Sequence, residues 1–235
     1  MNILALDTSS QAASCAILRD GALAGEFFVN IGLTHSQTAL PMVEKLLEQT
    51  MSTPGDIDVF AVTTGPGSFT GLRIGISAVK GMAMATGKPC AGVPTLAALA
   101  AGAEPFQGYI CPVMDARRGQ VYTAIFESRA HELHRIRRDE ALSIEALGTE
   151  LAGLPSSVLL VGDGAKLCYE ALGKPAHLCL APERFRHQRA SAVGAIAHEM
   201  ACGGQLVSAA ELAPVYLRLP QAERERMELI GDNCQ

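Results

Sequence analysis

The sequence predicts an α/β fold made of two similar lobes. In each half the same series recurs: a strand, a turn containing an acid, a returning strand, a helix, a strand, a Gly-x-Gly break and another helix. The acid is Asp7 in the first half and Asp115 in the second, and the breaks lie at 65–67 and 162–164. An internal duplication explains this order better than a chance likeness of two α/β segments. With 49% of its 235 residues hydrophobic, the chain can bury a sizeable core.

In the first half, apolar runs at 3–6, 12–18 and 23–29 flank turn residues and predict a meander of antiparallel strands. Apolar spacing predicts a helix over 34–49 with Thr34 as its cap, in which Pro41 sits awkwardly and could mark the true first turn. A buried strand over 59–64, a helix over 70–86 and a strand over 90–93 follow.

The second half predicts a hairpin from strands at 109–114 and 121–126, then a polar helix over 143–152. A buried strand at 158–161 and helices over 165–172 and 190–202 complete it. The expected lobes are 1–104 and 105–219, and the late helix could pack back on the first lobe. Residues 220–235 are expected to form a polar tail.

Composition narrows the functional class. The net charge is −5 and neither half is basic, so strong phosphate-driven nucleic-acid binding is not expected, and another subunit should hold most of any RNA. Seven cysteines, an odd number without C-x-x-C spacing, argue against a disulfide framework and a zinc site. The start lacks a basic region before its apolar run, and no apolar run reaches the roughly 20 residues of a membrane span. A cytoplasmic protein without membrane contact is therefore expected.

Two acidic turns could carry chemistry. The turn at Asp7, Thr8 and Ser9 could offer hydroxyls and backbone N–H groups to a phosphate, or could simply be a side-chain-bonded turn between strands. The turn at Asp115 is predicted to be the tip of a hairpin that carries charge, and it could simply be a solvated turn.

The segment GPGSFTGLRIG, residues 65–75, joins a buried strand to a helix. It matches neither the phosphate-binding Walker loop nor the dinucleotide fingerprint. Gly71 and Gly75 are four residues apart, and Ala78 and Ala85 extend a stripe of small residues that would let a second helix approach closely. That helix belongs either to the same lobe or to another subunit.

No catalytic constellation emerges. His131 and His134 are three residues apart without an evident third metal ligand, and no Gly-x-Ser-x-Gly elbow is present. We therefore predict no catalytic residues, no metal and no cofactor.

Five segments together resemble the TsaB (YeaZ) family over nearly the whole chain. They are LALDTSS at 4–10, His35-Ser36 with Leu40-Pro41, TGPGSFTGLRIG at 64–75, MDARRGQVY at 114–122 and PVYLR at 214–218. The resemblance implies the two-lobed fold of the acetate-kinase, sugar-kinase and actin class (ribonuclease-H-like). It also implies a role in making threonylcarbamoyladenosine at the tRNA adenosine beside the anticodon.

In that role the resemblance implies a pseudo-enzyme that forms a heterodimer with the transferase TsaD, with the ATPase TsaE in a larger complex and tRNA met only through the complex. TsaD carries metal-binding histidines in a segment that here reads VPTLAAL, residues 93–99, so its ligand positions fall on Thr95 and Leu99. Leucine cannot bind a metal and a lone threonine hydroxyl is a poor ligand. Asp7, Thr8, Ser9 and Asp115 are then vestigial candidates for nucleotide binding.

The resemblance further implies that the helices after Thr34 and Thr70 pack against the same two helices of TsaD as a four-helix bundle, a surface that a homodimer could also use. The predicted interface residues are His35, Leu40, Val43, Leu47, Thr70, Gly71, Leu72, Gly75, Ile76 and Ala78. The main alternative is a nucleotide-hydrolysing, kinase-like enzyme, which the duplicated acidic turns and Gly-x-Gly loops support. A protease is disfavoured because no nucleophile–base pair is identifiable.

Overall fold

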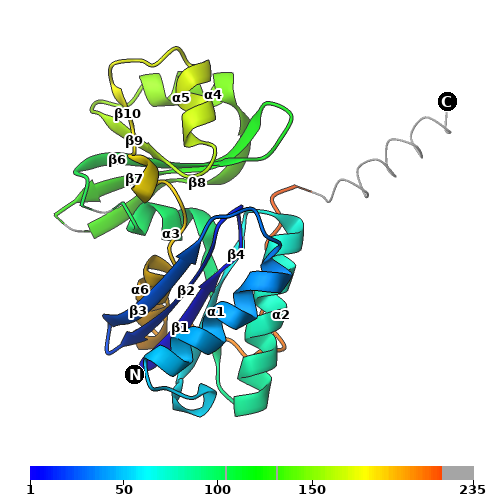
Figure 1. Ribbon diagram of the computed structural model, residues 1–235. Coiled ribbons are helices and arrows are strands. Elements are labelled where there is room, and N and C mark those ends of the chain that lie inside the picture. Colours follow the sequence, from blue (N-terminus) through cyan, green and yellow to red (C-terminus); the bar gives the residue numbers. More distant parts are fainter. Residues whose placement is uncertain (104, 131, 219–235) are drawn as a thin grey trace, which may run out of the picture.

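Two five-stranded mixed sheets, one in each lobe, organise the chain in the computed structural model (Figure 1). The structure describes residues 1–103, 105–130 and 132–218, so the predicted polar tail 220–235 lies outside the described residues.

The first sheet has the order β3-β2-β1-β4-β5. Strands β1 (Asn2–Asp7), β2 (Ala13–Arg19) and β3 (Ala22–Val29) form the predicted antiparallel meander. Strands β4 (Val59–Gly65) and β5 (Cys90–Pro94) continue it in parallel. Each strand predicted for the first half is therefore confirmed.

The second sheet repeats this topology in the order β10-β9-β6-β7-β8. Strands β6 (Gly108–Asp115), β7 (Gln120–Arg129) and β8 (Glu132–Ser143) form its meander, and β9 (Val158–Val161) and β10 (Leu178–Leu180) run parallel to β6. Because the two orders correspond strand for strand, the predicted duplication is confirmed. The sequence did not reveal β8, whose charged residues suggested a solvated segment, or the three-residue β10.

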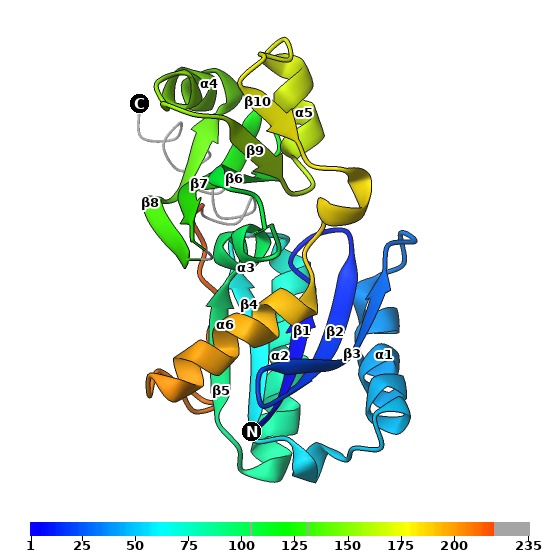
Figure 2. The ribbon, with the colours of Figure 1, turned by 90° about the vertical axis from the view of Figure 1, so that its left-hand side faces the viewer.

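Helices cover both faces of the first sheet (Figures 1 and 2). Helices α1 (His35–Gln49) and α2 (Phe69–Thr86) lie on one face and α6 (Ala190–Cys202) lies on the other. Pro41 lies inside α1, six residues after its first residue, so the interpretation of Pro41 as the first turn is wrong. In the described part of the chain, no helix combines the length and the apolar character needed to cross a membrane.

The second sheet carries α4 (Ile144–Ala152) and α5 (Ala165–Ala171) on one face. Its other face meets α3 (Thr95–Ala101), which follows β5 and was not predicted. Two short 3₁₀ turns, Pro54–Asp56 and Glu183–Phe185, complete the described elements.

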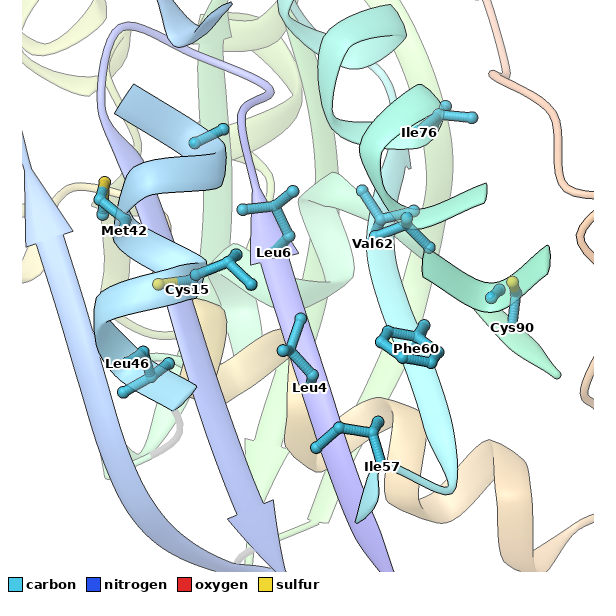
Figure 3. Close-up of a cluster of buried hydrophobic side chains, with 14 of the residues drawn as sticks. Leu4, Leu6, Cys15, Met42, Leu46, Ile57, Phe60, Val62, Ile76 and Cys90 are labelled. Atoms are coloured by element: carbon cyan, nitrogen blue, oxygen red, sulfur yellow. The ribbon is translucent and has the colours of Figure 1, made fainter. Parts of the chain in front are cut away.

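The core of the first lobe lies between the sheet and helices α1 and α2 (Figure 3). Alternate residues of β1 and β4 point into it, because successive side chains of a strand face opposite sides. Its members include Leu4, Leu6, Phe60, Val62, Met42, Val43, Leu46, Leu47, Leu72, Ile76 and Val79.

Helix α6 packs closely on the opposite face because that face is lined by small side chains. Ala16, Ala5, Ala61 and Ala91 form one row across four neighbouring strands. From edge strand β3, the Glu26 carboxylate accepts hydrogen bonds from N–H and Oγ of Ser191, at 2.9 and 2.8 Å. The chain thus returns to the first lobe after building the second.

Candidate functional site

A cavity of about 780 Å³ opens between the lobes, where the Asp7 turn, the N-terminus of α2 and the Asp115 turn meet. This volume lies within the range of small-molecule sites. We call it the cleft, and the residues that line it include Ser9, Ser10, His35, Ser68, Phe69, Asp115, Tyr122, Asp163, Tyr216 and Arg218.

The polar groups of Thr8 and Ser9 in the Asp7 turn form hydrogen bonds within the first lobe. Asp7 and Thr8 are buried and do not line the cleft. Backbone N–H and Oγ of Ser9 donate to Oδ1 of Asp7 at 3.0 and 2.9 Å, and the Thr8 hydroxyl donates to the Gly71 carbonyl at 2.8 Å. Burial raises the pKa of the Asp7 carboxyl, and the hydrogen bonds from Ser9 oppose that shift. These bonds favour the interpretation of a side-chain-bonded turn over that of a phosphate cradle.

The Asp115 turn repeats this geometry and does reach the cleft. Oδ1 of Asp115 accepts from the Arg117 N–H at 2.7 Å, two residues on, as Asp7 does from Ser9. The Asp115 N–H in turn donates to Oδ1 of Asp163 at 3.3 Å. Burial raises the pKa of Asp163, and the neighbouring Asp115 charge adds to the rise. Of the four vestigial candidates, the structure therefore brings Ser9 and Asp115 to the cleft and places Asp7 and Thr8 behind its wall.

Thr95 and Leu99 are the two positions that the family resemblance aligns with metal ligands of TsaD. Thr95 begins α3, and its buried hydroxyl has no hydrogen-bond partner among the described residues. Leu99 is buried in an apolar cluster shared with β6 and β7. Neither side chain offers an imidazole, thiolate or carboxylate.

A second hollow, of about 670 Å³, runs between α1 and α2 on the outer surface of the first lobe. We call it the groove. It is lined by His35, Ser36, Ala39, Leu40, Phe69, Thr70, Arg73, Ile74, Ser77 and Ala78. Leu40 is 53% exposed, and Met84, further along α2, is 73% exposed. Exposed apolar side chains beside a hollow are a feature of interaction sites.

The structure divides the ten predicted interface residues. His35, Leu40, Thr70 and Ala78 line the groove. The other six are buried in the first lobe, so their assignment to a partner surface is corrected to a role in the lobe's own packing: Val43, Leu47, Gly71, Leu72, Gly75 and Ile76.

The small residues Gly71 and Gly75 make a contact within the first lobe. They pack against the turn after β1 and not against another helix. A Cβ added at Gly71 would lie 2.1 Å from the Thr8 carbonyl oxygen, and one at Gly75 would lie 2.3 Å from Thr8 Oγ1. The glycines therefore let α2 pack against the turn after β1.

A different small-residue stripe faces outward, and of its members the sequence pointed only to Ala85, which was grouped with Gly71 and Gly75. Ser77, Gly81 and Ala85 follow one another at every fourth position of α2, and all are exposed. A Cβ at Gly81 would meet no atom of the described residues within 4 Å. The sequence did contain a signal for this stripe. Leu72 and Ile76 repeat every fourth residue and mark the inner face of the helix, so residues on the opposite side are expected to face outward.

The chain is similar in sequence to several known proteins. The family model described as "TsaD: tRNA N6-adenosine threonylcarbamoyltransferase" matches residues 32–211. The chain is 33% identical to the tRNA threonylcarbamoyladenosine biosynthesis protein TsaB of Bacillus subtilis, covering 97% of this chain and 99% of that protein. It is 34% identical to TsaB of Escherichia coli, covering 93% and 95% respectively.

Solved structures agree with the sequence relatives. YeaZ from Pseudomonas aeruginosa superposes with a TM-score of 0.77 at 29% identity, covering 92% of this chain and 99% of that one. Component A of the Acidaminococcus fermentans (R)-2-hydroxyglutaryl-CoA dehydratase, at 13% identity and a TM-score of 0.51, shares the fold alone, over 86% of this chain and 99% of that one. These likenesses and the duplicated sheets confirm the predicted α/β fold of two similar lobes. The chain belongs to the TsaB (YeaZ) family of tRNA threonylcarbamoyladenosine biosynthesis proteins.

Proposed function

We propose that the chain is the non-catalytic partner of a TsaD-type transferase in making threonylcarbamoyladenosine on tRNA, and that it docks through the outer faces of α1 and α2. The observation that carries the proposal is the exposed groove, flanked by a helix face whose central residue is Gly81.

The outer face of α2 suits close contact with another helix. Ser77, Gly81 and Ala85 would let a partner backbone approach, while Leu40 and Met84 supply apolar area on either side. Glycine in a helix interior costs about 0.5–1 kcal/mol relative to alanine. Within the described part of the chain, no atom lies close enough to Gly81 to require a glycine there, so contact with a partner would account for this residue.

Similarity to TsaD supports the choice of partner. Because the TsaD family model matches residues 32–211, the partner should share this fold and present an equivalent pair of helices. Two related surfaces can then pack with approximate two-fold symmetry, which also permits a homodimer through the same face. Under this proposal TsaE joins the larger complex, and tRNA is bound mainly by the other subunits because this chain carries a net charge of −5.

A non-enzymatic role is supported by the way the acidic turns are bonded. The hydroxyls of Thr8 and Ser9 donate to groups within the lobe, and Thr95 and Leu99 cannot replace metal-binding histidines. The alternative, a nucleotide-hydrolysing enzyme, is favoured by the size of the cleft and the pair Asp115 and Asp163 at its wall. Sustained ATP hydrolysis by the purified chain alone would establish that alternative.

The test is tRNA modification by purified components, with and without this chain and with Gly81→Leu. We expect the variant to melt at or slightly above the wild-type temperature, because Gly81 faces open space and glycine is unfavourable inside a helix, but to bind TsaD at least about tenfold more weakly and to lose modification. Ala195→Leu, the same kind of enlargement at an exposed site of α6, is the matched control and should change neither.

Wild-type TsaD binding by a folded Gly81→Leu chain would refute docking at this face. Modification at full rate without the chain would refute the partner role itself, and ATP turnover would become the hypothesis to test.

A further inference from the structure

The last described segment of the chain, residues 212–218, crosses from the first lobe to the second beside both the groove and the cleft. We call it the strap. Leu212 is buried in the core of the first lobe. The Val215 N–H donates to the Thr64 carbonyl at 2.8 Å, and the Val215 carbonyl oxygen fills the place of a Cβ at Gly65, 2.3 Å from it. The strap is thus fixed to the end of β4.

Beyond Val215, Tyr216 of the strap packs against two residues that line the groove. The rings of Tyr216 and Phe69 pack with centroids 5.1 Å apart, and the Arg73 guanidinium lies 3.8 Å above the centroid of Phe69. Nε of Arg73 donates to the Tyr216 hydroxyl at 3.1 Å. Phe69 and Arg73 both line the groove, whereas Phe69 and Tyr216 line the cleft. One three-residue stack therefore forms part of both surfaces.

Two residues further on, the strap reaches the second lobe. Nη1 of Arg218 donates to the Ala116 carbonyl at 3.0 Å. Ala116 precedes Arg117 and Arg118, whose φ angles are +65° and +55°, in the left-handed region that non-glycine residues rarely adopt. The contact holds a strained turn at the point where Asp115 enters the cleft.

We propose that the strap is a mechanical link that transmits docking at the groove to the Asp115 turn in the cleft. A helix seated between α1 and α2 would contact Phe69 and Arg73, and their stack fixes Tyr216. Tyr216 and Arg218 are only two residues apart. A displacement of the Tyr216 ring would therefore change the hydrogen bond from Arg218 to the Ala116 carbonyl. The link rests on the docking role proposed above, since it names how that surface acts on the cleft.

Hydrogen–deuterium exchange of the backbone amides of 115–121 tests the link, in the free chain and in the complex with TsaD. In the free chain, Arg218→Ala should raise exchange at this turn about tenfold, because one charge-assisted hydrogen bond is lost, and Arg218→Lys should restore part of the protection. Arg184→Ala is the control and should leave the turn unchanged, because the Arg184 guanidinium packs on the ring of its neighbour Phe185 instead.

In the complex, docking should alter exchange at the turn of the wild-type chain. Arg218→Ala should still bind TsaD within about threefold of the wild-type Kd, yet its turn should no longer respond, and the turn of Tyr216→Ala should not respond either. Tyr216→Phe keeps the ring stack and should respond as the wild type does.

Wild-type exchange in free Arg218→Ala, or a wild-type response in its complex, would overturn the link while leaving the docking role intact. Failure of the wild-type chain to bind TsaD would overturn the docking role and the coupling together. That outcome is distinguishable, because the free-chain comparison does not involve TsaD.

Discussion

At the scale of single residues, the two lobes use the same acidic turn in different surroundings. Asp7 and Asp115 each accept a hydrogen bond from the N–H two residues on, at 3.0 and 2.7 Å. Asp7 is buried and does not line the cleft, whereas Asp115 lines it. The same local signature therefore gives a structural carboxyl in one lobe and an accessible one in the other.

Because Asp7 is buried, we expect Asp7→Asn to raise the stability of the fold by an amount that depends on pH. The pKa of Asp7 is raised above its ordinary value of 3.8, so the folded state holds the proton more tightly than the unfolded state does. The stability that this protonation gives the fold is fully present below pH 3.8 and is lost as pH rises through the folded-state pKa. The amide keeps the acceptor for Ser9 but carries no charge. We expect a higher melting temperature than wild type at neutral pH and no difference below pH 3.8. A variant that is less stable at neutral pH would show that the ionised carboxylate has a role in the fold.

At the scale of elements, α2 presents two faces that each need small residues for a different contact. The inner face places Gly71 and Gly75 against the turn after β1. The outer face carries Ser77, Gly81 and Ala85 toward solvent. One helix can thus be fixed within its lobe and remain open to a partner.

These two faces predict opposite outcomes for the same substitution. Gly75→Leu should destabilise the chain by about 3 kcal/mol, because its Cβ would already lie 2.3 Å from Thr8 Oγ1. Gly81→Leu should keep the stability or raise it by up to about 1 kcal/mol, because glycine is unfavourable in a helix interior. Urea unfolding of both variants measures the difference, and equal stability of the two chains would contradict the assignment of the faces.

At the scale of the whole molecule, the lobes share a core. Leu96 and Leu99 of α3 pack against Ile110, Met114 and Phe126 of the second sheet. A division at residue 104 therefore separates segments that are buried together, and α6 adds to this by returning to the first sheet.

A shared core predicts cooperative unfolding. Leu99→Ala should cost about 2–5 kcal/mol and shift one common transition, because it opens a cavity between the lobes. Far-UV circular dichroism and tyrosine fluorescence, which here reports largely on the second lobe, should give coincident curves. Leu33→Ala, at a site 51% exposed, is the control and should change little. Two separate transitions, with only the fluorescence curve shifted, would show that the lobes unfold independently.

The sequence by itself determined the order of the elements, the duplication and the family. Apolar periodicity and turn residues such as Asp20-Gly21 are local signals, and they placed the strands of both meanders except β8. The short elements α3 and β10 were not predicted, because a run of a few apolar residues has no distinctive periodicity. Only the tertiary structure decided which predicted interface residues are accessible. Leu72 and Leu40 are both apolar residues on helices, but one meets the sheet and the other meets solvent. Exposure depends on what packs against a residue, and that partner is distant in the chain.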